Sequence, residues 1–308
     1  MVVKIKEKTY FGWNCFFLES DNISVGIAPQ IGGRIISFNF DGRELFFVQK
    51  EHAAEIFDFS ATVDLIAEKL KLGHRLWGGD KTWVAPQSAW LEGIPPLELD
   101  AGVYEAELGD NFVFMRSPLC RETSLRIERK ISLNENGVVQ LEESFLNENE
   151  KPIRRGIWNV TQCLRPFDVY LPLNKSELRA YPDEGASVEL FEEVVEEIGG
   201  WTLVRCNKPF HFKYGGVAQK GVVIALRDDD KGNLVFAKCF EADPTADYAH
   251  GSSVEVYNSP KYNYLEMEIH APLVELAPGE RQTHRQEWWV NYFGADITVQ
   301  EIFEARRI

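Results

Sequence analysis

The sequence predicts an all-β fold of many short antiparallel strands with few short helices. Apolar and polar residues alternate in short runs, and turn-forming residues separate these runs at modest spacing. The 308 residues are 44% hydrophobic and 26% charged, the balance of a globular protein that can bury a large core. No linker, low-complexity tract or clean repeat divides residues 1–308, so we expect one continuous sandwich or barrel domain.

Three segments carry the strongest hairpin signals. Residues 22–48 hold two alternating runs around Gly32-Gly33 and a turn at Asp41-Gly42. Residues 124–152 place the turn "NENG" between two such runs. Residues 208–242 suggest turns at the "GG" pair and at "DDDKGN". Each segment is therefore expected to form adjacent antiparallel strands.

Helical periodicity is clearest in residues 52–73. Val63, Ile66, Ala67 and Leu70 fall near a 3.6-residue period, and Gly73 offers a C-terminal stop. The acidic segment 187–201, "SVELFEEVVEEIGGW", fits either a short helix or a strand that ends at its glycine pair. The sequence leaves these two alternatives open.

Charge and motifs exclude several classes of function. A net charge of −15 and a pI near 5.0 disfavour nucleic acid and anionic membrane surfaces as partners. No apolar run approaches a spanning helix and no secretory signal is visible, so a cytoplasmic location is expected. Phosphate-loop, dinucleotide-binding, nucleophile-elbow and zinc-helix motifs are missing, and the six histidines are scattered singly, so we expect no cofactor and no metal. The five cysteines form no CxxC pair, which predicts buried free thiols: Cys15, Cys120, Cys163, Cys206 and Cys239.

Residues 72–90, "LGHRLWGGDKTWVAPQSAW", mix aromatic with polar side chains. Aromatic rings stack on the C–H faces of sugar rings, while polar groups bind hydroxyls, so this mixture suits a carbohydrate pocket. The candidate ligand-binding residues here are His74, Arg75, Trp77 and Gln87. The alternative is a surface loop that its tryptophans anchor to the core.

Three further segments have polar residues in strand phase. In "GIWNVTQC", Trp158 and Gln162 share one face if the strand is regular. "HGSSVEVYNS" begins at His250 and places Glu255 opposite its valines, although an exposed polar face would show the same pattern. In "YLEMEIH", residues 264–270, Glu266 and Glu268 point the same way, as a binding site or a solvated face requires.

Two terminal segments resemble the galactose mutarotase-like (aldose 1-epimerase) superfamily. "IGGRIISFNFDGRELF" is similar to its opening hairpin, and "LEMEIHAPLVELAPGERQTHRQEWWV" is similar to its terminal hairpin. The segments "GHRLW", "WNVTQ" and "HGSSVEVY" look like an uncharacterised branch of that superfamily. The resemblance implies a large antiparallel β-supersandwich and a small-molecule carbohydrate as partner.

The resemblance also implies roles for the acidic pair. Mutarotases use a glutamate at the position of Glu266 to take a proton from the anomeric hydroxyl, and Glu268 would assist it. Their acid histidine lies in a "TNH" strand, but "IWNVTQ" has none, so His74 or His250 would have to act instead. Arg34, after the glycine pair, is either a hydroxyl-binding residue or a hairpin surface charge.

Three functions remain open from the sequence: an aldose mutarotase or related epimerase, a non-catalytic carbohydrate-binding module, or a scaffold domain without a pocket. They differ in whether the candidate residues converge on one concave site. The sugar and the oligomeric state are not indicated.

Overall fold

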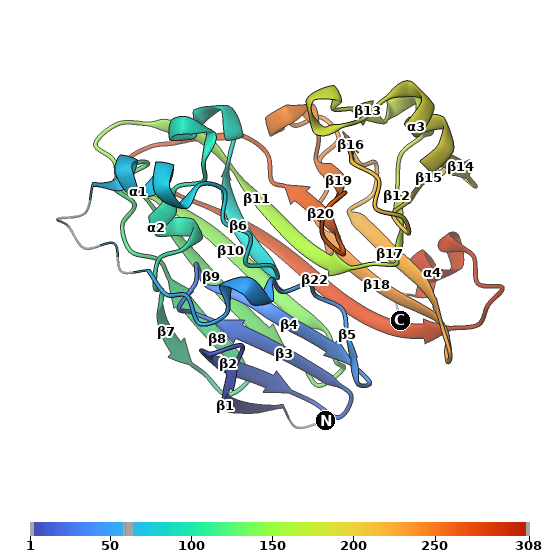
Figure 1. Ribbon diagram of the computed structural model, residues 1–308, viewed down its shortest axis with the longest axis horizontal. Helices are drawn as coiled ribbons and strands as arrows, with labels where there is room; N and C mark the ends of the chain where they lie inside the picture. Colours follow the sequence, from blue (N-terminus) through green and yellow to red (C-terminus); the bar gives the residue numbers. More distant parts are fainter. Residues whose placement is uncertain (1–2, 58, 60–63, 306–308) are drawn as a thin grey trace.

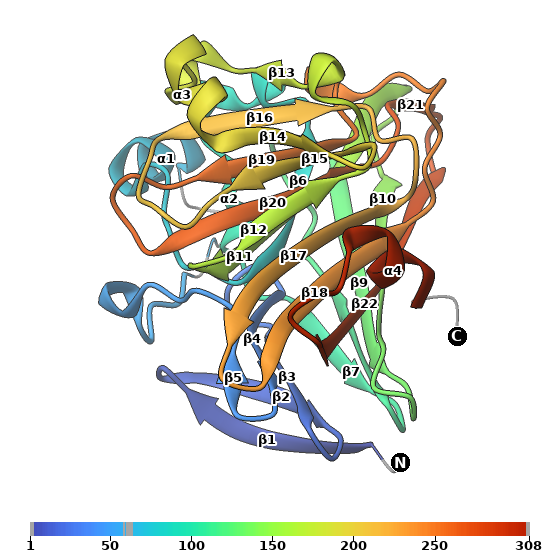
Figure 2. The same cartoon turned by 90° about the vertical axis from the view of Figure 1, so that its right-hand side faces the viewer.

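A computed structural model describes residues 3–57, 59 and 64–305. In this part of the chain, two large antiparallel sheets pack against each other, and short helices lie at their periphery (Figures 1 and 2), so the predicted all-β sandwich is confirmed. The described α-helices are α1 (Leu65–Leu72), α2 (Leu97–Asp100), α3 (Val188–Val194) and α4 (Val299–Ala305). Short 3-10 turns span Lys50–His52, Gln87–Ala89, Leu91–Gly93, Lys175–Glu177, Pro182–Glu184 and Ala249–Gly251. None of the described helices is long and apolar enough to cross a membrane.

The larger sheet has 12 described strands in the order β1-β2-β3-β4-β6-β11-β20-β19-β16-β13, with β5 paired to β4 and β21 paired to β11. Its strands are β1 (Lys4–Tyr10), β2 (Trp13–Glu19), β3 (Ile23–Ala28), β4 (Arg34–Phe40), β5 (Arg43–Glu44), β6 (Asp80–Ala85), β11 (Ile153–Leu164), β13 (Arg179–Ala180), β16 (Phe212–Gly216), β19 (Val254–Asn258), β20 (Tyr264–His270) and β21 (Val274–Leu276).

The smaller sheet has 10 described strands in the order β14-β15-β12-β17-β18-β22-β10-β9-β8-β7. They are β7 (Glu105–Leu108), β8 (Phe112–Arg116), β9 (Leu125–Leu133), β10 (Val139–Asn147), β12 (Asp168–Leu171), β14 (Val195–Ile198), β15 (Trp201–Arg205), β17 (Val222–Asp229), β18 (Gly232–Phe240) and β22 (Arg281–Phe293).

The predicted hairpins are present. Strands β3 and β4, β9 and β10, and β17 and β18 pair as neighbours. Asp41 and Gly42 join β4 to β5, and they adopt the positive φ values of 51° and 82° that a tight hairpin turn requires. The turn that was expected at Gly215-Gly216 does not lie at these residues, because both glycines belong to the end of strand β16. A side chain at Gly215 would collide with Glu255 on the neighbouring strand β19.

The C-terminal segment does not form the hairpin that the resemblance implied. Strand β20 lies in the larger sheet, β21 pairs with β11, and β22 crosses to the smaller sheet between β10 and β18. The "APGE" connection therefore carries the chain from one sheet to the other. This crossing brings the two ends of the predicted motif onto opposite layers of the sandwich.

The helical predictions are confirmed in part. Helix α1 ends at Gly73, whose backbone N–H donates to the Lys69 carbonyl, but the helix covers only the end of the predicted segment, and Val63 lies outside the described residues. Its apolar side chains face solvent, since Ile66 and Leu70 are 47% and 62% exposed. Lys69 is the buried residue instead, because its ammonium binds two backbone carbonyls and Glu122. Segment 187–201 forms both structures, helix α3 followed by strand β14.

Apolar side chains from both sheets fill the space between them. Phe38 of β4 and Phe46 contact Phe236 of β18 and Trp288 of β22, with ring centroids 5.3–6.2 Å apart. As predicted, Cys15, Cys120, Cys163 and Cys206 are buried thiols, while Cys239 is half-buried. The sheets are therefore held mainly by apolar burial.

Strand β1 is at one end of the larger sheet and pairs with β2. It is mostly exposed and carries Lys4, Lys6 and Lys8. Two of these lysines form ion pairs with Glu19 across the strand pair. The open edge of the larger sheet is thus rich in charge.

Four charged side chains are also buried between the sheets. Arg129 of β9 contacts Asp80 of β6 and lies 3.4 Å from Glu143 of β10. Lys238 of β18 donates to the side chains of Asn159 and Thr161 on β11, at 2.5 and 2.6 Å. The two acidic and two basic groups balance, as buried charges require.

Burial of this group shifts its titration. Burial lowers the pKa of Lys238 to about 8, although Asp80 and Glu143 oppose this effect. Burial raises the pKa of Asp80, and Arg129 and Lys238 oppose it. The carboxylates and the basic groups therefore depend on each other for charge compensation.

We expect Lys238→Met to destabilise the protein by about 3–5 kcal/mol, because removing one partner leaves buried carboxylates undercompensated. Urea unfolding monitored by circular dichroism measures this loss. The control is Lys231→Met on the exposed β17–β18 turn, where loss of the surface pair with Asp41 should cost less than about 1 kcal/mol. Equal losses in both variants would contradict the role of the buried charges.

Candidate functional site

Polar and aromatic side chains gather on the face of the larger sheet that points away from the smaller sheet. Alternate residues of adjacent strands share a face, and here the strands lie in the order β6, β11, β20, β19 and β16 (Figure 1). We call these side chains the polar face: Lys81 and Trp83 of β6, Trp158 and Gln162 of β11, Glu266, Glu268 and His270 of β20, Glu255 and Tyr257 of β19, and Lys213 of β16.

Glu266 occupies the middle of this face. It lies opposite Gln162 on β11 and Tyr257 on β19 in the strand register. The Gln162 amide donates to its Oε1 at 2.7 Å, and the Lys81 ammonium lies 3.4 Å from the same oxygen. The side chain is 12% exposed, so the carboxylate is neither in bulk solvent nor sealed among aliphatic groups.

Glu268 lies one step further along β20 and is fully buried. Its Oε2 accepts hydrogen bonds from the Trp158 indole at 2.8 Å and from the Lys213 ammonium at 2.9 Å. Burial raises the pKa of Glu268 to about 8, while Lys213 opposes the shift and Glu255 adds to it. The predicted sharing of one face by Glu266 and Glu268 is confirmed, but their environments differ.

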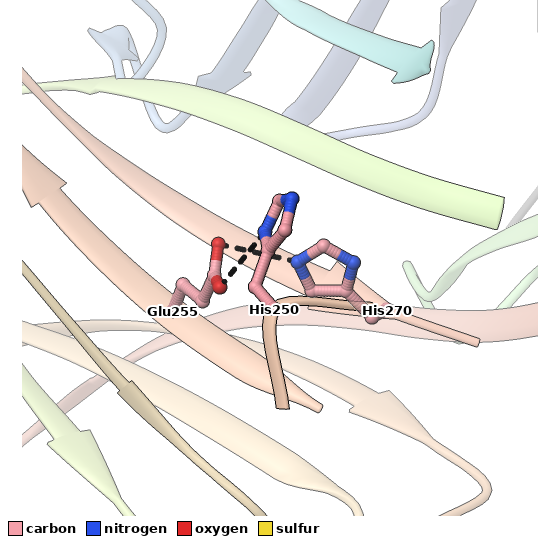
Figure 3. A group of neighbouring side chains, drawn as sticks. All are labelled: His250, Glu255 and His270. Atoms are coloured by element: carbon pink, nitrogen blue, oxygen red, sulfur yellow. Dashed lines mark hydrogen bonds and ion pairs between the residues drawn. The ribbon is translucent and has the colours of Figure 1, made fainter. Parts of the chain in front are cut away.

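Glu255 is the centre of a second group (Figure 3). Its carboxylate lies 2.7 Å from the Lys213 ammonium and 3.2 Å from a ring nitrogen of each of His250 and His270, and it accepts a hydrogen bond from the Tyr181 hydroxyl at 2.8 Å. Burial acts to raise the pKa of Glu255, but Lys213 and the histidines outweigh it, so the pKa lies well below its ordinary value. Glu255 is therefore a carboxylate at neutral pH.

Three tryptophans form an aromatic wall beside these groups. The ring centroids of Trp83, Trp90 and Trp158 are 5.0–5.6 Å apart. The Lys81 ammonium lies 4.3 Å from the Trp83 ring, and the His250 ring packs edge-on against Trp158 at 4.9 Å. Rings next to hydrogen-bonding groups are the composition that sugar recognition uses.

His74 reaches the same region from the loop between α1 and β6. Its ring packs edge-on against Trp83 at 5.5 Å, but the residue as a whole is exposed to solvent. The surrounding protein nevertheless removes hydration from the ring and lowers the pKa of His74, with Asp100 opposing this shift and Lys81 adding to it. Gln87 is partly exposed in the 3-10 turn that follows β6.

Other predicted ligand-binding residues are engaged by the protein itself. The Arg34 guanidinium is buried, binds Asp100 at 2.5 Å, and stacks over Trp77 at 5.2 Å. Trp77 is 1% exposed and packs in an apolar cluster beneath the loop. Arg75 forms an ion pair with Glu55. The guanidinium groups of Arg34 and Arg75 are therefore occupied by contacts within the protein, and none of the three residues contacts the glutamates of the polar face.

Three members of this region were not singled out from the sequence: Tyr181, Lys213 and His270. His270 carried a usable signal, because it is in phase with the two glutamates of its strand. Lys213 likewise lies between two apolar residues of an alternating strand. Tyr181 showed no such pattern, since it follows the two-residue strand β13.

Comparison with solved structures identifies the fold as galactose mutarotase-like. The chain is similar to a galactose mutarotase-like protein from Lactobacillus casei, with 9% identity, coverage of 90% of this chain and 100% of that chain, and a TM-score of 0.59. It is similar to a Klebsiella pneumoniae protein that carries the provisional name aldose 1-epimerase, with 11% identity, 98% and 87% coverage, and a TM-score of 0.64. The chain is also similar to the Slr1438 protein from Synechocystis sp. PCC 6803. The identity is 12%, the match covers 91% of this chain and 96% of that chain, and the TM-score is 0.62.

At these identities the likeness concerns the fold alone. Residues 100–291 match the family described as a domain of unknown function, DUF4380, and the chain belongs to this family. No curated protein matches the sequence significantly. The sequence resemblance to the galactose mutarotase-like superfamily is therefore confirmed at the level of fold, within an uncharacterised family.

We expect His74 to titrate below the ordinary histidine value of 6.5, because loss of hydration disfavours the imidazolium. The Lys81 and Arg34 cations act in the same direction, whereas Asp100 and Glu266 oppose it. A histidine NMR pH titration measures the value, and His74→Gln assigns the resonance. A pKa at or above 6.5 would contradict the expectation.

Proposed function

We propose that the protein binds a monosaccharide on the polar face and interconverts its anomers, with Glu266 as general base and His74 as general acid. The observation that carries this proposal is the placement of Glu266. Its carboxylate is partly open, is oriented by Gln162, and lies on a face with an aromatic wall. The shared fold adds support from structures named mutarotase-like.

The chemistry requires two proton transfers. The Glu266 carboxylate accepts the proton of the anomeric hydroxyl, and the His74 imidazolium donates a proton to the ring oxygen as the bond between that oxygen and C1 breaks. The resulting open-chain aldehyde rotates about the C1–C2 bond. Reversal of both transfers on its other face closes the ring as the opposite anomer, so no cofactor is consumed.

His74 supports this role by position, since it packs on Trp83 and lies within electrostatic reach of Glu266. Its lowered pKa gives a definite pH dependence. The protonated form predominates below that pKa, so the rate should fall as pH rises through values below 6.5. His250 remains the other histidine that reaches the face from a loop.

A second candidate function is sugar binding without turnover. The observation that favours it is the composition of β11, which presents Trp158, Val160 and Gln162 on the polar face but no histidine. A binding protein would use the same aromatic wall and carboxylates to hold hydroxyl groups. Turnover is what distinguishes the two functions.

NMR exchange spectroscopy over a panel of free and phosphorylated aldoses tests the proposal. We expect the wild type to accelerate anomer exchange, and Glu266→Gln and His74→Gln to lower the rate by roughly 10²–10⁴-fold. The matched control is Glu275→Gln, because this exposed glutamate on β21 lies outside the polar face.

Saturation-transfer NMR on the same samples measures binding separately. Binding without exchange would establish the second candidate function. Neither binding nor exchange with any aldose would refute both.

A further inference from the structure

Two imidazoles and a carboxylate converge at one place in the larger sheet (Figure 3), and both imidazoles pack against Trp158. One ligand atom from each of His250, Glu255 and His270 lies within 4.8 Å of the other two. His250 Nδ1 and His270 Nε2 are each 3.2 Å from a different oxygen of Glu255. Such a set differs from a solvated acidic cluster, because Glu255 and His270 are buried.

The pairing of His270 is incomplete. Its ring is 1% exposed and is held parallel to the Trp158 ring at 5.1 Å. Among the described residues, neither of its ring nitrogens has a hydrogen-bond partner of good geometry, although Nε2 lies only 3.2 Å from Glu255 Oε2, an oxygen that is ion-paired with Lys213. Leaving a buried imidazole without a hydrogen bond is costly, and a ligand bound to one of its nitrogens would remove that cost.

The backbone of His250 has an uncommon left-handed conformation. His250 has a φ of +57°, a conformation that residues other than glycine adopt rarely. Its carbonyl accepts a hydrogen bond from Arg179 at 2.8 Å, which holds the turn in place. Strain that is stabilised by neighbouring contacts is typical of functional sites.

We propose that His250, Glu255 and His270 bind one divalent transition-metal ion of the Zn²⁺ class. Metal–ligand bonds of about 2.0–2.2 Å place neighbouring ligand atoms roughly 3–3.5 Å apart. Each histidine nitrogen lies 3.2 Å from one oxygen of Glu255, and one atom from each of the three residues lies within 4.8 Å of the others, so a small approach of the rings completes the site. Three protein ligands leave a coordination position for water or for an oxygen of a bound molecule. Imidazole nitrogens favour such ions over Mg²⁺ or Ca²⁺.

Lys213 is the cation that competes for Glu255. Its ammonium is 2.7 Å from Glu255 Oε2, but it is also 2.9 Å from Glu268 Oε2. The second carboxylate allows Lys213 to keep an ion pair when the metal takes Glu255. The alternative to a metal site is a cluster without a metal, in which Lys213 is ion-paired with both Glu255 and Glu268.

Sequence spacing does not reveal this site. His250 and Glu255 are separated from His270 by the β19–β20 connection, and the register of these strands brings them together. The expectation of no metal, drawn from scattered histidines, is replaced by this proposal. The inference does not depend on the proposed sugar chemistry, because it concerns binding of the ion alone.

Titration of chelator-treated, full-length protein with Co²⁺, followed by visible absorption, tests the site directly. We expect one ion per chain, displaced by Zn²⁺, and a rise in the thermal unfolding midpoint with Zn²⁺. His250→Ala and Glu255→Gln should weaken binding by roughly 100-fold or more, since loss of mere supporting contacts already costs 10–100-fold.

The matched control is His211→Ala, because this partly exposed histidine lies outside the set and should leave Co²⁺ binding unchanged. Glu255→Gln keeps the shape of the side chain, so circular dichroism separates loss of a ligand from loss of the fold. Absence of Co²⁺ and Zn²⁺ binding by the wild type would overturn the proposal in favour of the Lys213-centred cluster. Undiminished binding by folded His250→Ala and Glu255→Gln would overturn it equally.

Discussion

Strand β11 must satisfy buried polar groups on both of its faces, and the rest of the structure depends on this constraint. Asn159 and Thr161 point inward and bind the charges between the sheets, whereas Trp158 and Gln162 point outward and orient the glutamates of β20. A slip of the strand register by one residue would exchange these sets. The side chains of Asp80, Lys238, Glu266 and Glu268 would then each lose their hydrogen bonds to β11, so the inner polar groups help to specify the register that aligns the outer face.

The large features of the fold were predictable because they are local. Alternation of apolar residues and turn glycines identified the hairpins, and both are properties of neighbouring residues. The crossing of β22 to the smaller sheet was not predictable in this way, since its partners β10 and β18 are remote in the sequence. The buried side of helix α1 was not predictable for a similar reason, because distant carbonyls and Glu122 bind Lys69 and bury it, while Leu70 is exposed.

The candidate site was predictable where alternation along a strand alone determines on which side of the sheet a side chain lies. Alternation predicted the facing of Glu266, Glu255 and Trp158 within their own strands, and the pairing of these strands brings the three side chains onto one face. Residues chosen from the loop were less predictable, because their partners decide their place: Arg34 is drawn into the interior by Asp100. Lys213 and Tyr181 belong to the region only through pairings across the sheet, which one sequence does not reveal.

The lysines of β1 affect more than the strand on which they lie. An unpaired strand edge exposes backbone donors and acceptors that invite a strand from another molecule. Any such strand would have to approach Lys4, Lys6 and Lys8, two of which are held in ion pairs with Glu19. The lysines of β1 therefore disfavour addition of a further strand at this edge of the sheet. They thereby protect the protein from fibrous association when many copies are crowded together.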